Sequence, residues 1–231
     1  MPLLFTRNIP ILPETVLTFG AWQIAEDEFY FRDDLPLTPE EEDDLARFKG
    51  VRRLEWLAGR WLLHKLTGSE ERFPLGKNAF AKPFFLHRPE LHCSLSHSHG
   101  VVGAMVAEQV CGCDLQVLVD KMPRLAHKFL HLDEAAFLNA YPPQAQFDLL
   151  HVFWTAKESL YKAYGLKELD FREHLRLEPF EWPGQRAQTI GWVQKEGFRR
   201  PYRLHFEKAD QPDGTGAFIW CVCVEVGRLG Q

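Results

Sequence analysis

Residues 153–162 carry the side chains with the clearest potential for chemistry. Trp154, Glu158 and Lys162 recur every four residues, so they share one face of an α-helix, which turns once in 3.6 residues. Gly165 follows as a typical helix stop. A glutamate and a lysine four residues apart form a surface ion pair worth about 0.3–0.5 kcal/mol, or they hold a metal ion and a phosphate. The helix alone leaves both interpretations open.

Asp114 is the second candidate, in an apolar segment over 110–117 that reads as a strand. Alternation along a strand places Asp114 and Gln116 on one face, with Cys113 and Leu115 on the other. Burying a carboxylate is costly unless it is paired or bound to a metal. Asp114 is therefore predicted to have a cationic partner.

The helices and strands around these residues are predicted from hydrophobic periodicity and from capping residues, glycines and prolines. Thr38 and Glu41, with Pro39 between them, form a predicted capping box for a helix that ends at Gly68 and is interrupted at residues 49–50. Further helices are predicted over 123–130, 133–141 and from near Phe147 to 164. Strands are predicted over 101–107, 110–117, 171–177, 189–193, 203–206 and 217–226. Residues 1–37 are predicted as strands and loops, and residues 70–92 contain no clear helix. Segregated helices and strands indicate an α+β fold.

The composition excludes several classes of protein. The 231 residues are 45% hydrophobic and 13% aromatic, enough for one core or two small ones, and the net charge of −5 argues against a nucleic-acid binder. No run approaches the roughly 18 apolar residues of a membrane span, and the first residues do not resemble a signal peptide. The five cysteines match no common zinc pattern. We therefore expect a cytoplasmic protein with reduced, buried thiols.

Four motifs in order resemble the 4′-phosphopantetheinyl transferases of the larger, monomeric Sfp type. Residues 154–162 are similar to the family's W-x-x-K-E-x-x-x-K, and residues 111–116 to its V/I-G-x-D-x-E. Residues 94–98 are similar to S-x-S-H-S, and residues 82–83 to a G-K-P-x turn. Glu134 matches a further family glutamate, with His131 at the position that caps its helix.

The resemblance implies transfer of the 4′-phosphopantetheine arm from coenzyme A to a serine of an apo acyl or peptidyl carrier protein. The reaction would need Mg²⁺ and release adenosine 3′,5′-bisphosphate. The implied fold is a pseudo-twofold monomer of two similar α+β halves, residues 1–110 and 111–231, with coenzyme A between them. The first half would serve the adenine and 3′-phosphate, and the second the metal and pyrophosphate.

The resemblance also implies roles for individual residues. Asp114 and Glu158 would bind Mg²⁺, and either Glu158 or a water on the metal would take the proton of the carrier serine. The residues implied in binding coenzyme A are Arg53, Arg60, Lys82, Ser96, His97, Lys157 and Lys162, of which His97 and Lys162 would also assist catalysis through the phosphates.

Several alternatives stay open. Gln116 replaces the family's second acid, so it offers a neutral carbonyl oxygen or leaves its place to water. That departure motivates a rival function, a module that binds coenzyme A or a carrier protein with reduced or lost catalysis. Arg53, Trp56 and Arg60 form a basic-aromatic stripe along one helix, and the spacing alone favours a solvated face with snorkelling arginines over a binding role. Lys157 is either a solvated lysine or a phosphate contact, and Trp154 is predicted to belong to the core.

Overall fold

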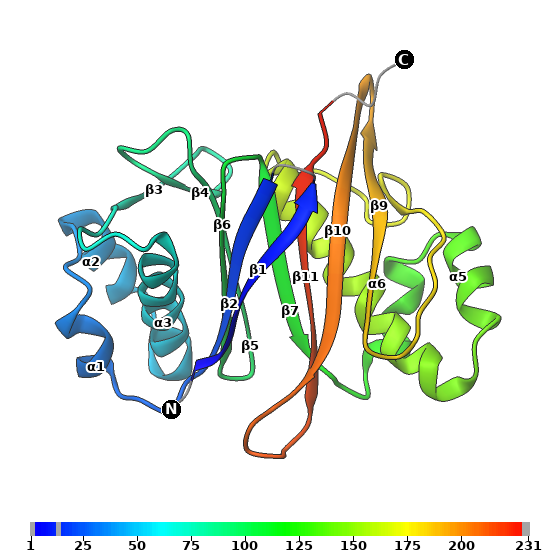
Figure 1. Ribbon diagram of the computed structural model, residues 1–231, viewed down its shortest axis with the longest axis horizontal. Coiled ribbons are helices and arrows are strands. Elements are labelled where there is room, and N and C mark those ends of the chain that lie inside the picture. The colour runs from blue at the N-terminus through cyan, green and yellow to red at the C-terminus, as the bar shows by residue number, and fades with distance from the viewer. Residues whose placement is uncertain (1–2, 13–14, 228–231) are drawn as a thin grey trace. The chain divides into compact units, whose positions relative to one another are not determined.

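The computed structural model describes residues 3–12 and 15–227, and these fall into two compact units that divide between Gln109 and Val110. Each unit combines an antiparallel sheet with helices (Figure 1). The predicted α+β class is confirmed. Residues 1–2 and 13–14 of the predicted N-terminal strand region lie outside the described residues. None of the described helices is long and apolar enough to cross a membrane.

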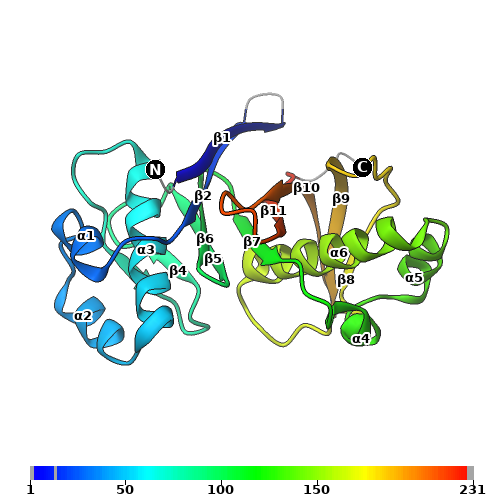
Figure 2. The ribbon, with the colours of Figure 1, turned by 90° about the horizontal axis from the view of Figure 1, so that it is seen from below.

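A four-stranded antiparallel sheet forms the frame of the N-terminal unit. Its order is β1 (Leu3–Leu12), β2 (Thr15–Gln23), β6 (Val101–Ala107) and β5 (His92–Ser98). Helix α3 (Gly50–Thr67) packs against β2, β5 and β6 (Figures 1 and 2). Fully buried side chains such as Leu57 and Val102 fill the space between helix and sheet. Strand β6 has the predicted bounds.

Two shorter helices precede α3. Helix α2 (Pro39–Ala46) begins with the predicted capping box, in which Thr38 and Glu41 each accept from the other's backbone N–H. Gly50 has a φ of +53°, a left-handed backbone that separates α2 from α3 as expected. Helix α1 (Glu28–Asp33), capped by Asp27, corrects the prediction of only strands and loops before residue 38. Six residues are too few for a helical period to stand out.

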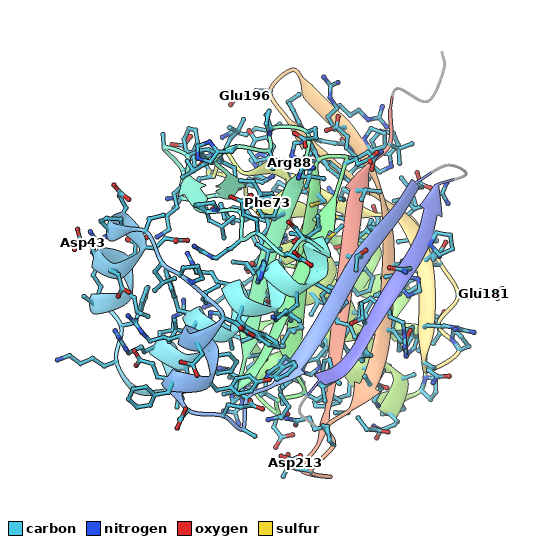
Figure 3. All side chains as sticks on the ribbon, turned by 60° about the vertical axis from the view of Figure 1, so that its left-hand side comes forward. Asp43, Phe73, Arg88, Glu181, Glu196 and Asp213 are labelled. Atoms are coloured by element: carbon cyan, nitrogen blue, oxygen red, sulfur yellow. The ribbon has the colours of Figure 1, made fainter. Side chains whose placement is uncertain are left out.

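Residues 70–92 contain a short hairpin instead of a helix. Strands β3 (Leu75–Lys77) and β4 (Pro83–Phe85) pair antiparallel, and the Asn78 side chain accepts from two backbone N–H groups of the connecting turn. The prediction that residues 70–92 contain no clear helix is confirmed. Nearby, the Arg88 guanidinium lies 4.7 Å from the centre of the Phe73 ring (Figure 3).

A five-stranded antiparallel sheet forms the frame of the C-terminal unit. Its order is β7 (Cys111–Val117), β11 (Ala217–Glu225), β10 (Phe198–Asp210), β9 (Arg186–Lys195) and β8 (Leu175–Leu177). Helix α6 (Pro143–Tyr164) crosses this sheet, and it follows α4 (Met122–Leu125), a 3-10 turn (Ala126–Lys128) and α5 (Leu132–Asn139). Helix α6 begins one turn before the predicted start because Pro143 occupies the first helical position, where proline is favoured.

The core of this unit lies between α6 and the sheet. Trp154 packs its ring against Phe129 and Phe171, with ring centres 5.4 and 5.8 Å apart, which confirms its predicted place at the core. All five cysteines are free and buried, as expected. Asp114 pairs with Cys221 across the two neighbouring strands, so both side chains face α6.

Candidate active site

The close approach of β7 to α6 positions the two predicted carboxylates. A Cβ atom at Gly112 would lie 2.1 Å from the carbonyl oxygen of Ser159 and 2.7 Å from the backbone nitrogen of Ala163. Only glycine therefore allows the strand to lie this close to the helix. Asp114, two residues further along the same face of β7, is brought against the last turns of α6, which carry Glu158 and Lys162.

Lys162 binds across to the strand. Its Nζ donates to Asp114 Oδ1 at 2.7 Å and to the Cys113 carbonyl oxygen at 3.0 Å. Asp114 is buried, whereas Lys162 keeps about a quarter of its side chain exposed (27%). The cationic partner predicted for Asp114 is thus found in the helix motif. The interpretation of Lys162 as half of a simple surface pair does not hold, because it joins two elements.

The electrostatics of the site centre on Glu158, which is half-buried. Burial raises the pKa of Glu158 from its usual 4.5 to about 7, the negative charge of Asp114 adds to the rise, and Lys162 opposes it. Burial, the largest single effect, lowers the pKa of Lys162, but the attraction of Asp114, Cys113 and Glu158 together exceeds it and the net result is a raised pKa. Lys162 therefore binds Asp114 directly and acts on Glu158 through its charge alone, while the pKa of Glu158 lies near neutral pH.

This donor set suits Mg²⁺, which binds proteins through one or two carboxylates and completes its octahedral shell with water and phosphate oxygens. A divalent cation would also relieve the repulsion that raises the pKa of Glu158. No cluster of three or more histidine, cysteine or acidic residues suited to an ion occurs within residues 3–12 and 15–227. The Gln116 side chain donates a hydrogen bond from Nε2 to the Val117 carbonyl oxygen at 2.8 Å. A metal role for Gln116 stays a prediction.

Lys157 departs from both of its predicted roles. Its side chain is fully buried, and Nζ donates to Glu134 Oε2 at 2.6 Å and to the carbonyl oxygens of Phe129 at 2.7 Å and Phe171 at 2.9 Å. All three ammonium protons are thereby used inside the unit. Lys157 is consequently neither solvated nor a phosphate contact, but a structural residue. Glu134 also accepts from the backbone N–H of His131, in the expected capping box.

His97 and Ser96 lie on β5 in the N-terminal unit. The exposed His97 ring has its Nδ1 3.0 Å from Glu55 Oε2, and the Arg52 guanidinium also contacts the ring. Glu55 is buried on α3 and accepts from the backbone N–H of Gly100 at 3.3 Å. Sequence reasoning missed Glu55, although an acid between apolar positions of a predicted helix was a signal for it. Such a carboxylate fixes the orientation of an imidazole.

The stripe of Arg53, Trp56 and Arg60 on α3 is not the solvated face that the spacing favoured. Arg60 is only 8% exposed, stacks 3.4 Å from the Trp56 ring centre, and has a pKa that burial lowers to about 10. Arg53 donates through Nε and Nη2 to Glu28 at 2.6 and 2.7 Å, and through Nη1 to a backbone carbonyl at 2.8 Å. Because these hydrogen bonds engage all three guanidinium nitrogens, they argue against a role of Arg53 in binding a phosphate. Lys82 lies half-buried beside the turn before β4.

The structure thus brings three predicted residues together in the C-terminal unit: Asp114, Glu158 and Lys162. Lys157 lies on the same helix but faces away into the core. Gln116 lies on β7 of the same unit. The other predicted residues belong to the N-terminal unit: Arg53, Arg60, Lys82, Ser96 and His97.

Comparison with known families defines the class of protein. Residues 110–223, which include the strand and the helix of the carboxylate site, match the model of the 4′-phosphopantetheinyl transferase superfamily. The match covers nearly all of the C-terminal unit, which belongs to this superfamily, and the resemblance that the motifs indicated is confirmed.

Individual relatives agree with this assignment. The chain is similar to the 4′-phosphopantetheinyl transferase AcpT of Salmonella typhi, with 32% identity over 120 residues, or 51% of this chain and 62% of that protein. It is also similar to the 4′-phosphopantetheinyl transferase gsp of Aneurinibacillus migulanus, with 28% identity over 151 residues, 65% of this chain and 60% of the relative. The chain thus spans about 60% of the length of the curated relatives it matches.

Proposed function

We propose that this protein transfers the 4′-phosphopantetheine arm of coenzyme A to a serine of an apo acyl or peptidyl carrier protein, with Mg²⁺, releasing adenosine 3′,5′-bisphosphate. The observation that carries the proposal is the arrangement of Asp114, Glu158 and Lys162 within the residues that match the superfamily.

The chemistry explains why these residue types are needed. Cleaving a pyrophosphate concentrates negative charge on phosphate oxygens, so catalysis consists mainly of positioning and charge neutralisation. When bound, Mg²⁺ supplies most of that neutralisation. Asp114 and Glu158 would hold the ion from the strand and the helix. Lys162, fixed against Asp114 at 2.7 Å and about a quarter exposed, would place its positive charge beside a phosphate oxygen.

Glu158 is also the candidate for accepting the serine proton. A general base works best when its pKa lies near the pH of the reaction, and the pKa of Glu158 is raised to about 7 by burial and by Asp114. That pKa applies without a bound cation; a divalent ion on Glu158 would lower it, and a water on the metal is then the alternative proton acceptor.

The N-terminal unit would contribute to binding coenzyme A. His97, whose ring is oriented by Glu55, would donate a hydrogen bond to a phosphate. Ser96, Lys82 and Arg60 remain proposed contacts of the nucleotide.

The rival proposal is a module that binds coenzyme A or a carrier protein but has reduced catalysis. It is favoured by Gln116, which supplies no negative charge where the family motif has an acid. A protein with two carboxylates keeps the minimum that Mg²⁺ requires, so we favour the enzyme.

A panel of apo carrier proteins tests both proposals. The protein is incubated with coenzyme A, Mg²⁺ and carriers from fatty-acid, polyketide and nonribosomal-peptide systems, and each carrier is weighed by mass spectrometry. The enzyme proposal expects one phosphopantetheine on at least one carrier, lost in Asp114→Ala and Glu158→Ala but retained in Glu181→Ala, a change at an exposed loop residue (Figure 3). If no carrier gains mass while coenzyme A still raises the melting temperature of the protein, the result supports the binding module and refutes the enzyme proposal.

A further inference from the structure

A second concave site lies in the C-terminal unit, away from the carboxylates. Its volume is about 490 Å³, within the range of small-molecule sites. It is lined by α5, α6, β8, β9 and the residues that follow β8. Strand β8 forms one edge of the five-stranded sheet, whereas β7, which carries Asp114, forms the opposite edge. The cavity is therefore a separate site.

Aromatic side chains make up much of the cavity wall. Phe137 of α5 and Phe153 of α6 lie 5.1 and 5.9 Å from Phe180, measured between ring centres, and Trp192 of β9 lines the same cavity. The Arg199 guanidinium lies 4.3 Å from the Trp192 ring centre and takes one face of that ring. The aromatic lining still offers apolar surface against which a further aromatic ring packs favourably.

The acidic groups of the lining are already engaged. Glu134 accepts from Lys157 and from the backbone N–H of Leu177. Glu178 Oε1 accepts from the Trp192 indole Nε1 at 2.9 Å. Asp133, with a side chain that is 90% exposed, lies 3.1 Å from a ring nitrogen of His131.

Arg176 is the exception among the charged groups of the lining. Across residues 3–12 and 15–227, its guanidinium has neither a hydrogen-bond partner nor an acid within ion-pair distance. It is half-buried on the edge strand β8, opposite Trp192 in the register with β9. Burial without a counter-charge lowers the pKa of Arg176. A partly desolvated guanidinium with five free donors is a binding element for a planar anion.

We propose that this cavity binds a small aryl carboxylate, with its ring against Phe137, Phe180 and Trp192 and its carboxylate on Arg176. A carboxylate matches the planar fork of arginine in a bidentate manner. A phosphate ester would bring a second negative charge towards Glu134, Glu178 and Asp133, and this repulsion favours the singly charged ligand.

The test uses 2-naphthoate as the probe and the full chain without coenzyme A or carrier. The Trp192 indole N–H signal in ¹H–¹⁵N NMR spectra, assigned by its loss in Trp192→Phe, reports on the cavity wall. Titration with 2-naphthoate is expected to shift this signal saturably. The neutral isostere 2-naphthamide is expected to bind at least about tenfold more weakly, because a hydrogen-bonded charge contributes more than a neutral group.

Two matched variants complete the design. Arg176→Gln is expected to weaken 2-naphthoate at least about tenfold while leaving 2-naphthamide unchanged. Arg200→Gln removes the same charge from a strand residue outside the cavity, whose side chain is 42% exposed, and is expected to leave both affinities unchanged. Equal affinity for the two probes, an Arg176→Gln variant that binds like the wild type, or no shift at millimolar probe would overturn the proposal. Since the titration needs no transferase substrate, its result is independent of the proposed function.

Discussion

Replacing Glu158 by glutamine should stabilise the protein while abolishing its proposed activity. The wild-type carboxyl group titrates at about 7 in the folded protein against a usual 4.5. A raised pKa means that the folded state binds this proton more tightly than the unfolded chain, so the stability of the wild type falls as pH rises between these two values. Glutamine mimics the protonated carboxyl group and carries no such penalty.

The size of the effect follows from the displaced pKa. One pKa unit corresponds to about 1.36 kcal/mol, so the penalty on the wild type is below about 1 kcal/mol at pH 5 and reaches about 3 kcal/mol at pH 8. Solvent contact of the half-buried carboxyl group reduces the upper figure. We therefore expect Glu158→Gln to gain about 1–3 kcal/mol at pH 8, or about 2–12 °C in melting temperature for a chain of this size.

The assay is thermal unfolding by circular dichroism at pH 5, 6, 7 and 8, with Glu181→Gln as the control for loss of an exposed carboxylate. Mg²⁺ at pH 8 should narrow the gap between wild type and Glu158→Gln, because the ion stabilises only the protein that binds it. The reasoning is refuted if Glu158→Gln melts below the wild type at pH 8, or if its advantage is the same at pH 5 and pH 8.

Three further experiments probe the packing, the buried ion pair and the thiols of the protein. Gly112→Ala places a Cβ atom 2.1 Å from the Ser159 carbonyl oxygen and should lower the free energy of unfolding in urea by more than about 3 kcal/mol. The control Gly227→Ala, which has open space around it, should leave stability unchanged. Similar unfolding curves for the two variants would contradict the packing argument. Lys157→Met leaves the buried Glu134 without its counter-charge and should lower the free energy of unfolding by about 3–5 kcal/mol. Adding Glu134→Gln should recover part of this stability in the same experiment. A purely steric role of Lys157 would give no such recovery. A thiol reagent should modify none of the five buried cysteines in the native state and all five in urea; fewer than five in urea would reveal a disulfide.

Local signals in the sequence predicted a large part of the fold. The capping box at Thr38 and Glu41, the break at Gly50 and the continuous apolar strand over 101–107 each depend on neighbouring residues alone, and all three are present. The short helix α1 was missed because six residues contain fewer than two helical turns.

The site was predictable to the extent that motifs specify it. Asp114, Glu158 and Lys162 were identified from two separate motifs, and the structure joins them through β7 and α6. The burial of Lys157 was not predictable, because helical spacing does not reveal that the backbone carbonyls of Phe129 and Phe171 accept hydrogen bonds from its ammonium group. Long-range partners of this kind arise from tertiary packing, which a helical pattern does not encode.

The buried ammonium of Lys157 also limits how the length of this protein can vary. It joins α6 to the backbone at residues 129 and 171 and so fixes the rotation of the helix about its axis. An insertion or deletion of one residue between Lys157 and Lys162 would turn Lys162 by about 100°, away from Asp114. The exposed turn at residues 212–215 between β10 and β11 has no such constraint. That turn is accordingly the place to insert an affinity tag or a fluorescent label without disturbing the helix that carries the site.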